Sequence, residues 1–126
     1  MDHDSTRVRL FTRLLPGHTV LAICGEVDFA STPRLRDQIA IALRNPTVPV
    51  IIDLSAVSFC DASGLALLVG VQRRARLYGL PVVLVGPRRN VDKLLRITGL
   101  DQTFTIYPTL AAAERGRGHS VRAAVA

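Results

Sequence analysis

The sequence predicts a single α/β domain with a mostly parallel central sheet, one antiparallel edge strand and flanking helices. Two short apolar runs, Val48–Leu54 and Leu80–Gly86, have the composition of strands buried on both faces. Capped helices separate them from each other and from their neighbours, and strands joined in this way run parallel, with right-handed crossovers. The alternation of polar and apolar residues in Arg7–Leu14 instead indicates a half-exposed strand. Pro16-Gly17 joins it to a second strand, His18–Gly25, so this pair is expected to form an antiparallel hairpin at the sheet edge.

Helix start and stop signals predict the remaining elements. The first helix begins at Ser31 or Thr32, carries Pro33 in its first turn and is stopped by Asn45-Pro46. The later elements are, in order, the helix Asp61–Tyr78 stopped by Gly79, the helix Val91–Thr98 capped by Asn90, the strand Phe104–Tyr107 and a helix opened by Pro108 or Thr109 that runs to Glu114.

Length and composition favour one soluble domain. The chain has 126 residues, and 48% of them are hydrophobic, which is enough for one core. No stretch approaches the run of about 18 apolar residues that a membrane-spanning helix needs, and the polar N-terminus does not resemble a secretory signal. We therefore expect a cytoplasmic protein that makes no membrane contact. Cys24 and Cys60 lie in apolar segments without metal-ligand spacing, so both are expected to be buried thiols. The domain is expected to span residues 7–115, between a disordered tail at 1–6 and a flexible tail at 116–126.

The net charge of +6 does not by itself indicate nucleic-acid binding. Fifteen of the sixteen basic residues are arginine, and they are scattered in twos and threes along the chain. No aromatic residues alternate with them to form a stacking platform for bases. We therefore expect a solvated basic surface and no specific nucleic-acid partner.

The functional prediction centres on the junction between the buried strand Val48–Leu54 and the next helix. Asp61 stands at the N-cap position, where its carboxylate can accept hydrogen bonds from the first helical turn. Ser63 falls in that first turn, near the positive end of the helix dipole, where anions are favoured. Gly64 follows, so no neighbouring side chain is expected to cover the serine hydroxyl.

Parallel topology predicts which polar residues meet this serine. The carboxyl ends of parallel strands lie along one edge of a sheet, and ligands of open α/β sheets usually bind there. This edge is expected to gather Glu26, Asp28, Asp61, Ser63, Arg88 and Arg89.

Catalytic and nucleotide-binding arrangements are not recognisable. The only histidines, His3, His18 and His119, lie in the two tails and at a strand start far from Ser63, so no triad is predicted. Asp53 could be the acid of a phosphoaspartate receiver, but the acid pair after the first strand is missing and the one lysine, Lys93, lies inside a helix. The sequence contains neither a Walker loop nor a Gly-x-Gly-x-x-Gly turn. We expect no catalytic residue, no metal site and no cofactor.

Three segments resemble the STAS domain family, in particular the bacterial anti-sigma factor antagonists. Asp53–Leu65, which reads DLSAVSFCDASGL, resembles the family's central motif. Gly25-Glu26-Val27-Asp28 resembles its Gly-Glu-Leu-Asp motif, and Val91 to Phe104 resembles its late helix and turn. The likeness covers about residues 8 to 115.

The resemblance implies a STAS-like fold and a binding module without catalysis. Such proteins bind an anti-sigma factor that is also a serine kinase, and thereby release a sigma factor. The kinase phosphorylates a hydroxyl at the start of the central helix, and a serine phosphatase restores the antagonist. The expected partner-binding residues are Glu26, Asp28, Asp61, Ala62, Ser63, Gly64, Leu65 and Arg88.

One position departs from the family pattern. The motif usually carries two adjacent hydroxyl residues, and the first is generally the phosphoacceptor; here that position is Ala62 and only Ser63 remains. Phosphorylation has therefore either moved to Ser63 or been lost. The alternative to a switched antagonist is a STAS module that binds another protein, a small ligand or a nucleotide without phosphorylation control. A monomer or a weak homodimer is expected.

Overall fold

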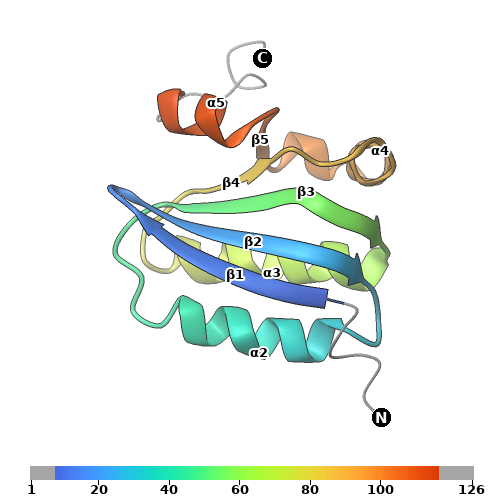
Figure 1. The fold of residues 1–126 in the computed structure, drawn as a ribbon, viewed down its shortest axis with the longest axis horizontal. Helices are drawn as coiled ribbons and strands as arrows, with labels where there is room; N and C mark the ends of the chain where they lie inside the picture. The colour runs from blue at the N-terminus through green and yellow to red at the C-terminus, as the bar shows by residue number, and fades with distance from the viewer. Residues whose placement is uncertain (1–7, 117–126) are drawn as a thin grey trace.

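The computed structural model describes residues 8–116, which form a five-stranded sheet with helices on both faces (Figure 1). The strands are, in spatial order, β1 (Val8–Leu15), β2 (His18–Val27), β3 (Val50–Cys60), β4 (Val82–Val85) and β5 (Thr105–Tyr107). The helices are α2 (Thr32–Ala42), α3 (Ala62–Arg76), α4 (Arg89–Ile97) and α5 (Leu110–Arg115), with a short 3₁₀ helix, η1 (Leu100–Gln102), after α4. Strand β1 pairs antiparallel with β2 and all later pairs are parallel, which confirms the predicted fold class.

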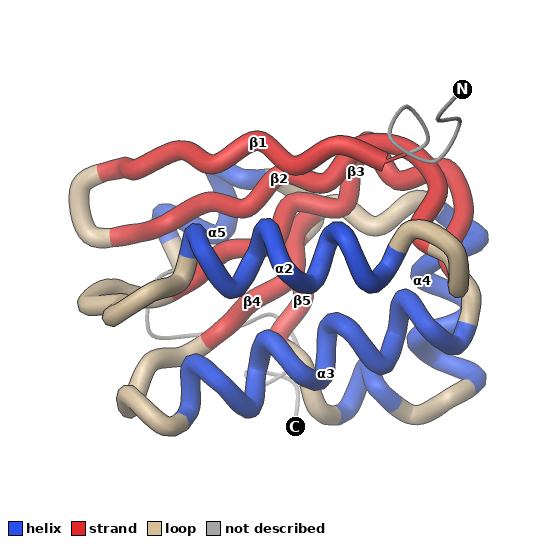
Figure 2. Tube along the Cα trace, turned by 90° about the horizontal axis from the view of Figure 1, so that it is seen from below, coloured by secondary structure: helices blue, strands red, loops and turns tan. Residues whose placement is uncertain are grey.

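The two faces of the sheet pack against different helices. Helices α2 and α3 lie side by side across one face (Figure 2) and share the larger core with it. On the other face, α5 covers a smaller cluster in which Ala113 packs with Ile51 and Tyr107. The neighbouring residues Ile51 and Ile52 are 1% and 0% exposed and belong to different clusters. The apolar run in β3 is therefore buried on both faces, as its composition predicts.

The N-terminal hairpin forms as predicted. Leu15 pairs with His18 across the Pro16-Gly17 turn, and Gly17 has the positive φ of 82° that favours glycine. Strand β1 is the edge of the sheet.

Strand β3 is longer than the sequence predicts. It was expected to end at Leu54, but it continues to Cys60 through a segment that reads as a loop. The extension pairs only with β2, because β4 ends at Val85, opposite Asp53. Two register shifts against β2 accompany it, and at the first of them the carboxylate of Asp53 accepts hydrogen bonds from Ser55 N at 3.0 Å and Ser55 Oγ at 2.7 Å. A bulged strand of this kind loses the regular alternation by which strands are recognised.

Two predicted helix caps are wrong. Helix α4 begins at Arg89 instead of Val91, and the Asn90 side chain donates to the backbone oxygen of Ser58 at 2.9 Å instead of capping the helix. Ser31 occupies the N-cap of α2, as one of the two predicted positions, but its hydroxyl makes no capping bond to the helix and donates to the backbone oxygen of Glu26 in β2. By contrast, Thr109, one of the two residues predicted to begin α5, caps this helix by accepting a hydrogen bond from Ala112 N at 3.0 Å.

Of the two predicted tails, 1–6 and 116–126, the structure describes only Gly116. Gly116 was assigned to the flexible tail, but its carbonyl accepts a hydrogen bond of 2.6 Å from the Tyr107 hydroxyl. Residues 1–7 and 117–126, which include the predicted N-terminal tail, lie outside the described residues. Within residues 8–116, no helix has both the length and the apolarity needed to cross a membrane.

Candidate functional site

Asp61 organises the start of α3. Its backbone is extended (φ −111°, ψ −170°), and its Oδ1 accepts hydrogen bonds from Ser63 N at 2.8 Å and Gly64 N at 3.2 Å. This is the N-cap that the sequence predicts. The second oxygen, Oδ2, accepts from Phe29 N at 3.2 Å, across 32 residues of sequence. One carboxylate therefore both caps the helix and fixes the loop that follows β2.

The loop after β2 is held by its own polar groups. Asp28 N donates to Ser31 Oγ and Ser31 N donates to Asp28 Oδ1, both at 3.0 Å. The Ser31 hydroxyl also donates to the backbone oxygen of Glu26 at 3.0 Å, and Asp61 N donates to Val27 O at 3.2 Å. These bonds place Glu26 and Asp28 next to the start of α3, as the topology predicts.

This loop exposes an aromatic residue that sequence reasoning did not select. Phe29 is 80% exposed although its backbone N–H is bound by Asp61. Phe59, paired with Glu26 at the ends of the two strands, is 47% exposed. A large apolar residue directly after Asp28, in a polar loop, is the signal by which Phe29 could have been found. Aromatic residues, phenylalanine included, are enriched in the cores of protein–protein interfaces.

Ala62 and Ser63 form the accessible part of the helix start. Ala62 is exposed and Ser63 is half-buried. Within residues 8–116, the Ser63 hydroxyl makes no hydrogen bond, so it is available to a partner or an enzyme. The first-turn donors Ser63 N and Gly64 N are already bound by Asp61, which leaves fewer N–H groups for an anion than the sequence suggests.

Gly64 faces the interior, which corrects the expectation that it keeps the serine hydroxyl open. A Cβ atom at this position would lie 2.5 Å from Cys60 Sγ and 3.0 Å from both Cγ1 and the backbone oxygen of Val27. The glycine therefore lets α3 begin in direct contact with the ends of β2 and β3. Burial, reinforced by the neighbouring Asp61 carboxylate, raises the pKa of the Cys60 thiol to about 11.

Two of the predicted partner-binding residues offer little surface. Gly64 is buried, and Leu65 is 5% exposed and belongs to the larger core. Both position the helix start and do not present side chains to a partner.

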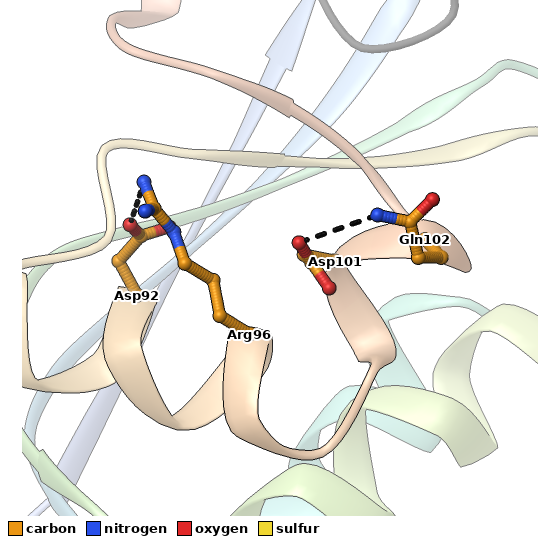
Figure 3. A network of polar contacts seen from close by, with 4 residues as sticks. All are labelled: Asp92, Arg96, Asp101 and Gln102. Atoms are coloured by element: carbon orange, nitrogen blue, oxygen red, sulfur yellow. Dashed lines mark hydrogen bonds and ion pairs between the residues drawn. The ribbon is translucent and has the colours of Figure 1, made fainter. Parts of the chain in front are cut away.

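Arg88 lies along β3 and not at its end, contrary to the expected cluster. Its Nε donates to the backbone oxygen of Ser55 at 3.0 Å. Ser55 precedes Cys60 by five residues, or roughly 15 Å along a strand. The extension of β3 carries Asp61 and Ser63 beyond the end of β4. Two further polar pairs lie on α4 and η1 (Figure 3). On α4, Arg96 forms an ion pair with Asp92 at 2.9 Å. On η1, Gln102 Nε2 donates to Asp101 Oδ2 at 3.5 Å.

Potential ligands of a metal are dispersed. Over the described part of the chain, no group of three or more histidine, cysteine or acidic side chains could hold a metal ion. His18 lies at the start of β2, whereas Ser63 follows the end of the parallel strand β3, so the two are at opposite ends of the sheet. His3 and His119 are outside the described residues.

Fold and motif together match a known family. The pattern of the STAS domain covers residues 11–113, which include β2, β3 and the capped start of α3. The chain belongs to the STAS domain family.

Several bacterial anti-sigma factor antagonists are similar to most of the chain. An anti-sigma-F factor antagonist, RsfB, from Mycobacterium tuberculosis is 32% identical over 101 residues, covering 79% of this chain and 81% of the relative. An anti-sigma-B factor antagonist from Listeria monocytogenes is 28% identical over 89 residues, covering 71% and 78%. The crystal structure of an anti-sigma factor antagonist from Mycobacterium paratuberculosis superposes with a TM-score of 0.74 at 32% identity, covering 90% of this chain and 94% of that one.

Proposed function

We propose that this protein is an anti-sigma factor antagonist that binds an anti-sigma factor and so frees a sigma factor for transcription. The observation that carries the proposal is the similarity to bacterial antagonists, at 32% identity over about four fifths of both chains. The geometry supports a binding role, because one carboxylate joins the helix start to the loop after β2 and presents both as one surface. In this role the protein acts in the cytoplasm as a monomer or weak homodimer and has no catalytic function of its own.

The proposed binding surface, here called the α3-start surface, comprises Glu26, Asp28, Phe29, Asp61, Ala62 and Ser63. Phe29 supplies an apolar anchor, since 80% of its surface is exposed. Ala62 is exposed and small, so a partner can approach the helix backbone at this point. The bonds between Asp28 and Ser31 fix the loop before binding, which reduces the entropy that binding must overcome.

Ser63 is the proposed phosphoacceptor, with the anti-sigma factor as the serine kinase and a separate serine phosphatase as the reversing enzyme. Ser63 is half-buried, and its hydroxyl makes no hydrogen bond within residues 8–116. A phosphate adds about −1.5 to −2 charges at neutral pH. Because Asp61 already occupies two first-turn N–H groups, the phosphate would lie beside a carboxylate and present a strongly negative helix start. Phosphorylation would therefore block binding by charge repulsion while the fold stays intact.

The binding proposal is tested by calorimetric titration with each purified anti-sigma factor of the source organism. We expect one of them to bind, and Ala62→Arg to abolish that binding by covering the α3-start surface. Leu77→Arg is the matched control, because Leu77 is 86% exposed at the other end of α3. If none of the anti-sigma factors binds, the proposed function is wrong.

The switch is tested separately by incubation with the binding anti-sigma factor and ATP, followed by phosphopeptide mass spectrometry. We expect phosphate on wild type and on Ser58→Ala, and none on Ser63→Ala. Ser58 is the matched control because it is an exposed serine near the end of β3, the strand that leads to α3. If the protein binds the anti-sigma factor but takes up no phosphate, the switch proposal is wrong. The protein would then be an antagonist that is not regulated by phosphorylation, with Ala62 in place of the usual phosphoacceptor.

A further inference from the structure

A groove separates the two helices that cover the larger core. It lies between α2 and α3, which run side by side along the sheet (Figure 2), and has a volume of about 350 Å³. Its floor is apolar: Ile39, Leu67 and Val71 are 3%, 2% and 6% exposed. The groove lies next to the α3-start surface, because Leu67, the first residue of α3 that lines it, follows Ser63 by four residues, or about 6 Å along a helix.

The glycine in this groove has no packing role within the described chain. Gly70 is exposed in the middle of α3, and a Cβ atom built there would meet no atom within 4 Å. Glycine is the least favourable residue in a helix interior apart from proline, so its presence here weakens the helix without improving any contact. A residue that breaks a local rule without internal compensation is typical of a functional position.

The exposed side of α3 leading to Gly70 is also built from small residues. Ala62 and Ala66 precede Gly70 at four-residue spacing, and all three are exposed. On α2, Ala40 lines the same groove. Small residues on facing helices allow another helix to approach the backbone closely, which longer side chains would prevent.

Charge at the groove is predominantly positive. Arg36 on α2 and Arg74 on α3 line it, together with one acid, Asp37. Within residues 8–116, neither arginine has an ion pair or a hydrogen bond through its side chain. The two guanidinium groups are therefore available to carboxylates of a bound molecule, with geometry suited to bidentate pairing.

We infer that the α2–α3 groove is a second docking site, which takes an acidic amphipathic helix of a protein partner. Apolar side chains of that helix would contact Ile39 and Val71, and its carboxylates would pair with Arg36 and Arg74. A nucleic acid would bring a polar backbone against the apolar floor, and a flat membrane surface would not enter the space between two helices. Where the partner is the anti-sigma factor, this inference rests on the proposed function.

The first test uses a synthetic probe and does not depend on the proposed function. The probe is an 18-residue amphipathic helix with leucines on one face and glutamates on both flanks, compared with the same peptide carrying lysines. Backbone amide shifts of the labelled protein are recorded by NMR. We expect the acidic peptide to move the amides of Ala40 and Gly70, and Gly70→Leu to abolish the effect by filling the groove. No shift at these residues, an equal shift with the lysine peptide, or a larger shift with duplex DNA or anionic phospholipid vesicles would each overturn the inference.

The second test uses the anti-sigma factor identified by calorimetry. We expect Arg36→Glu/Arg74→Glu to weaken its binding at least tenfold. Lys93→Glu/Arg115→Glu, which makes the same change in net charge at exposed positions on α4 and α5, should leave the affinity within twofold. Equal affinity of both double variants, with wild type binding normally, would overturn the groove as part of that interface and leave the proposed function intact. Absence of binding by wild type would overturn the proposed function and leave the peptide result to decide the groove.

Discussion

Gly64 and Gly70 lie six residues apart on α3 and meet opposite environments. A Cβ at Gly64 would come within 2.5 Å of Cys60 Sγ, whereas one at Gly70 would meet nothing within 4 Å. The first glycine is required by the chain's own packing, because the helix starts in contact with two strand ends. The second has no such requirement, which is why we assign it to an external partner. The same residue type in the same helix thus carries a structural role at one position and a binding role at the other.

The largest effect is expected from filling the crowded position. Gly64→Val should lower the free energy of unfolding by about 3 kcal/mol, because the added carbons have no space between Cys60 and Val27. Urea denaturation measures the loss. Gly70→Val is the matched control and should cost less than about 0.5 kcal/mol, since valine and glycine both have low helix propensity and the site is open. Equal losses at the two positions would contradict the distinction between them.

Removing the N-cap of α3 should lower the free energy of unfolding by less than filling the space at Gly64 does. Asp61→Ala is expected to lower the free energy of unfolding by about 1–2 kcal/mol, the range for a lost N-cap. It also removes the acceptor of Phe29 N, so the loop after β2 should exchange its amide hydrogens faster. Asp61→Asn keeps an acceptor oxygen and should lose less. An unchanged exchange rate at Phe29 in Asp61→Ala would show that the carboxylate does not hold this loop.

The alkylation rate of Cys60 reports on the close contact between its sulfur and Gly64. Because the pKa of Cys60 is raised from 9.0 to about 11, roughly a hundredfold less thiolate is present at pH 8 than for an ordinary thiol. The higher intrinsic reactivity of a more basic thiolate offsets part of this, so iodoacetamide should react about tenfold more slowly than in the urea-unfolded chain. Mass spectrometry of a Cys24→Ser variant measures the rate. Gly64→Ala should accelerate the reaction by displacing the sulfur, whereas Gly70→Ala should not.

The smallest effect has the opposite sign. Gly70→Ala should raise the free energy of unfolding by about 0.5–1 kcal/mol, because alanine restores helix propensity where nothing obstructs it. Thermal and urea denaturation measure the gain. A loss of stability at this position would mean that the groove needs its glycine for internal packing, and the reason to assign it to a partner would disappear.

Strand β3 shows where prediction from sequence succeeds and where it stops. Its first part, through Leu54, is a continuous apolar run flanked by partners on both sides, and such a run is recognisable without the structure. Its second part, from Ser55 to Cys60, mixes small, polar and aromatic residues and is bulged against β2. No periodicity identifies such a segment as a strand, because its backbone pairing depends on a neighbour far away in the sequence. The contact of Arg88 with Ser55 could not be predicted for the same reason, because the strand that contains Ser55 was expected to end at Leu54.

The sequence alone determined the order of the elements, the parallel crossovers, the antiparallel edge strand and the Asp61 cap. These depend on local periodicity, on short-range hydrogen bonding and on connection length, all of which are encoded within a few residues. Only the tertiary structure decided that Asp61 also holds Phe29, that Gly64 faces Val27 and Cys60, and that Gly70 opens onto a groove beside α2. Each of these depends on the close approach of segments that are distant in the chain, and that approach is set by strand register and helix packing, which no local pattern records.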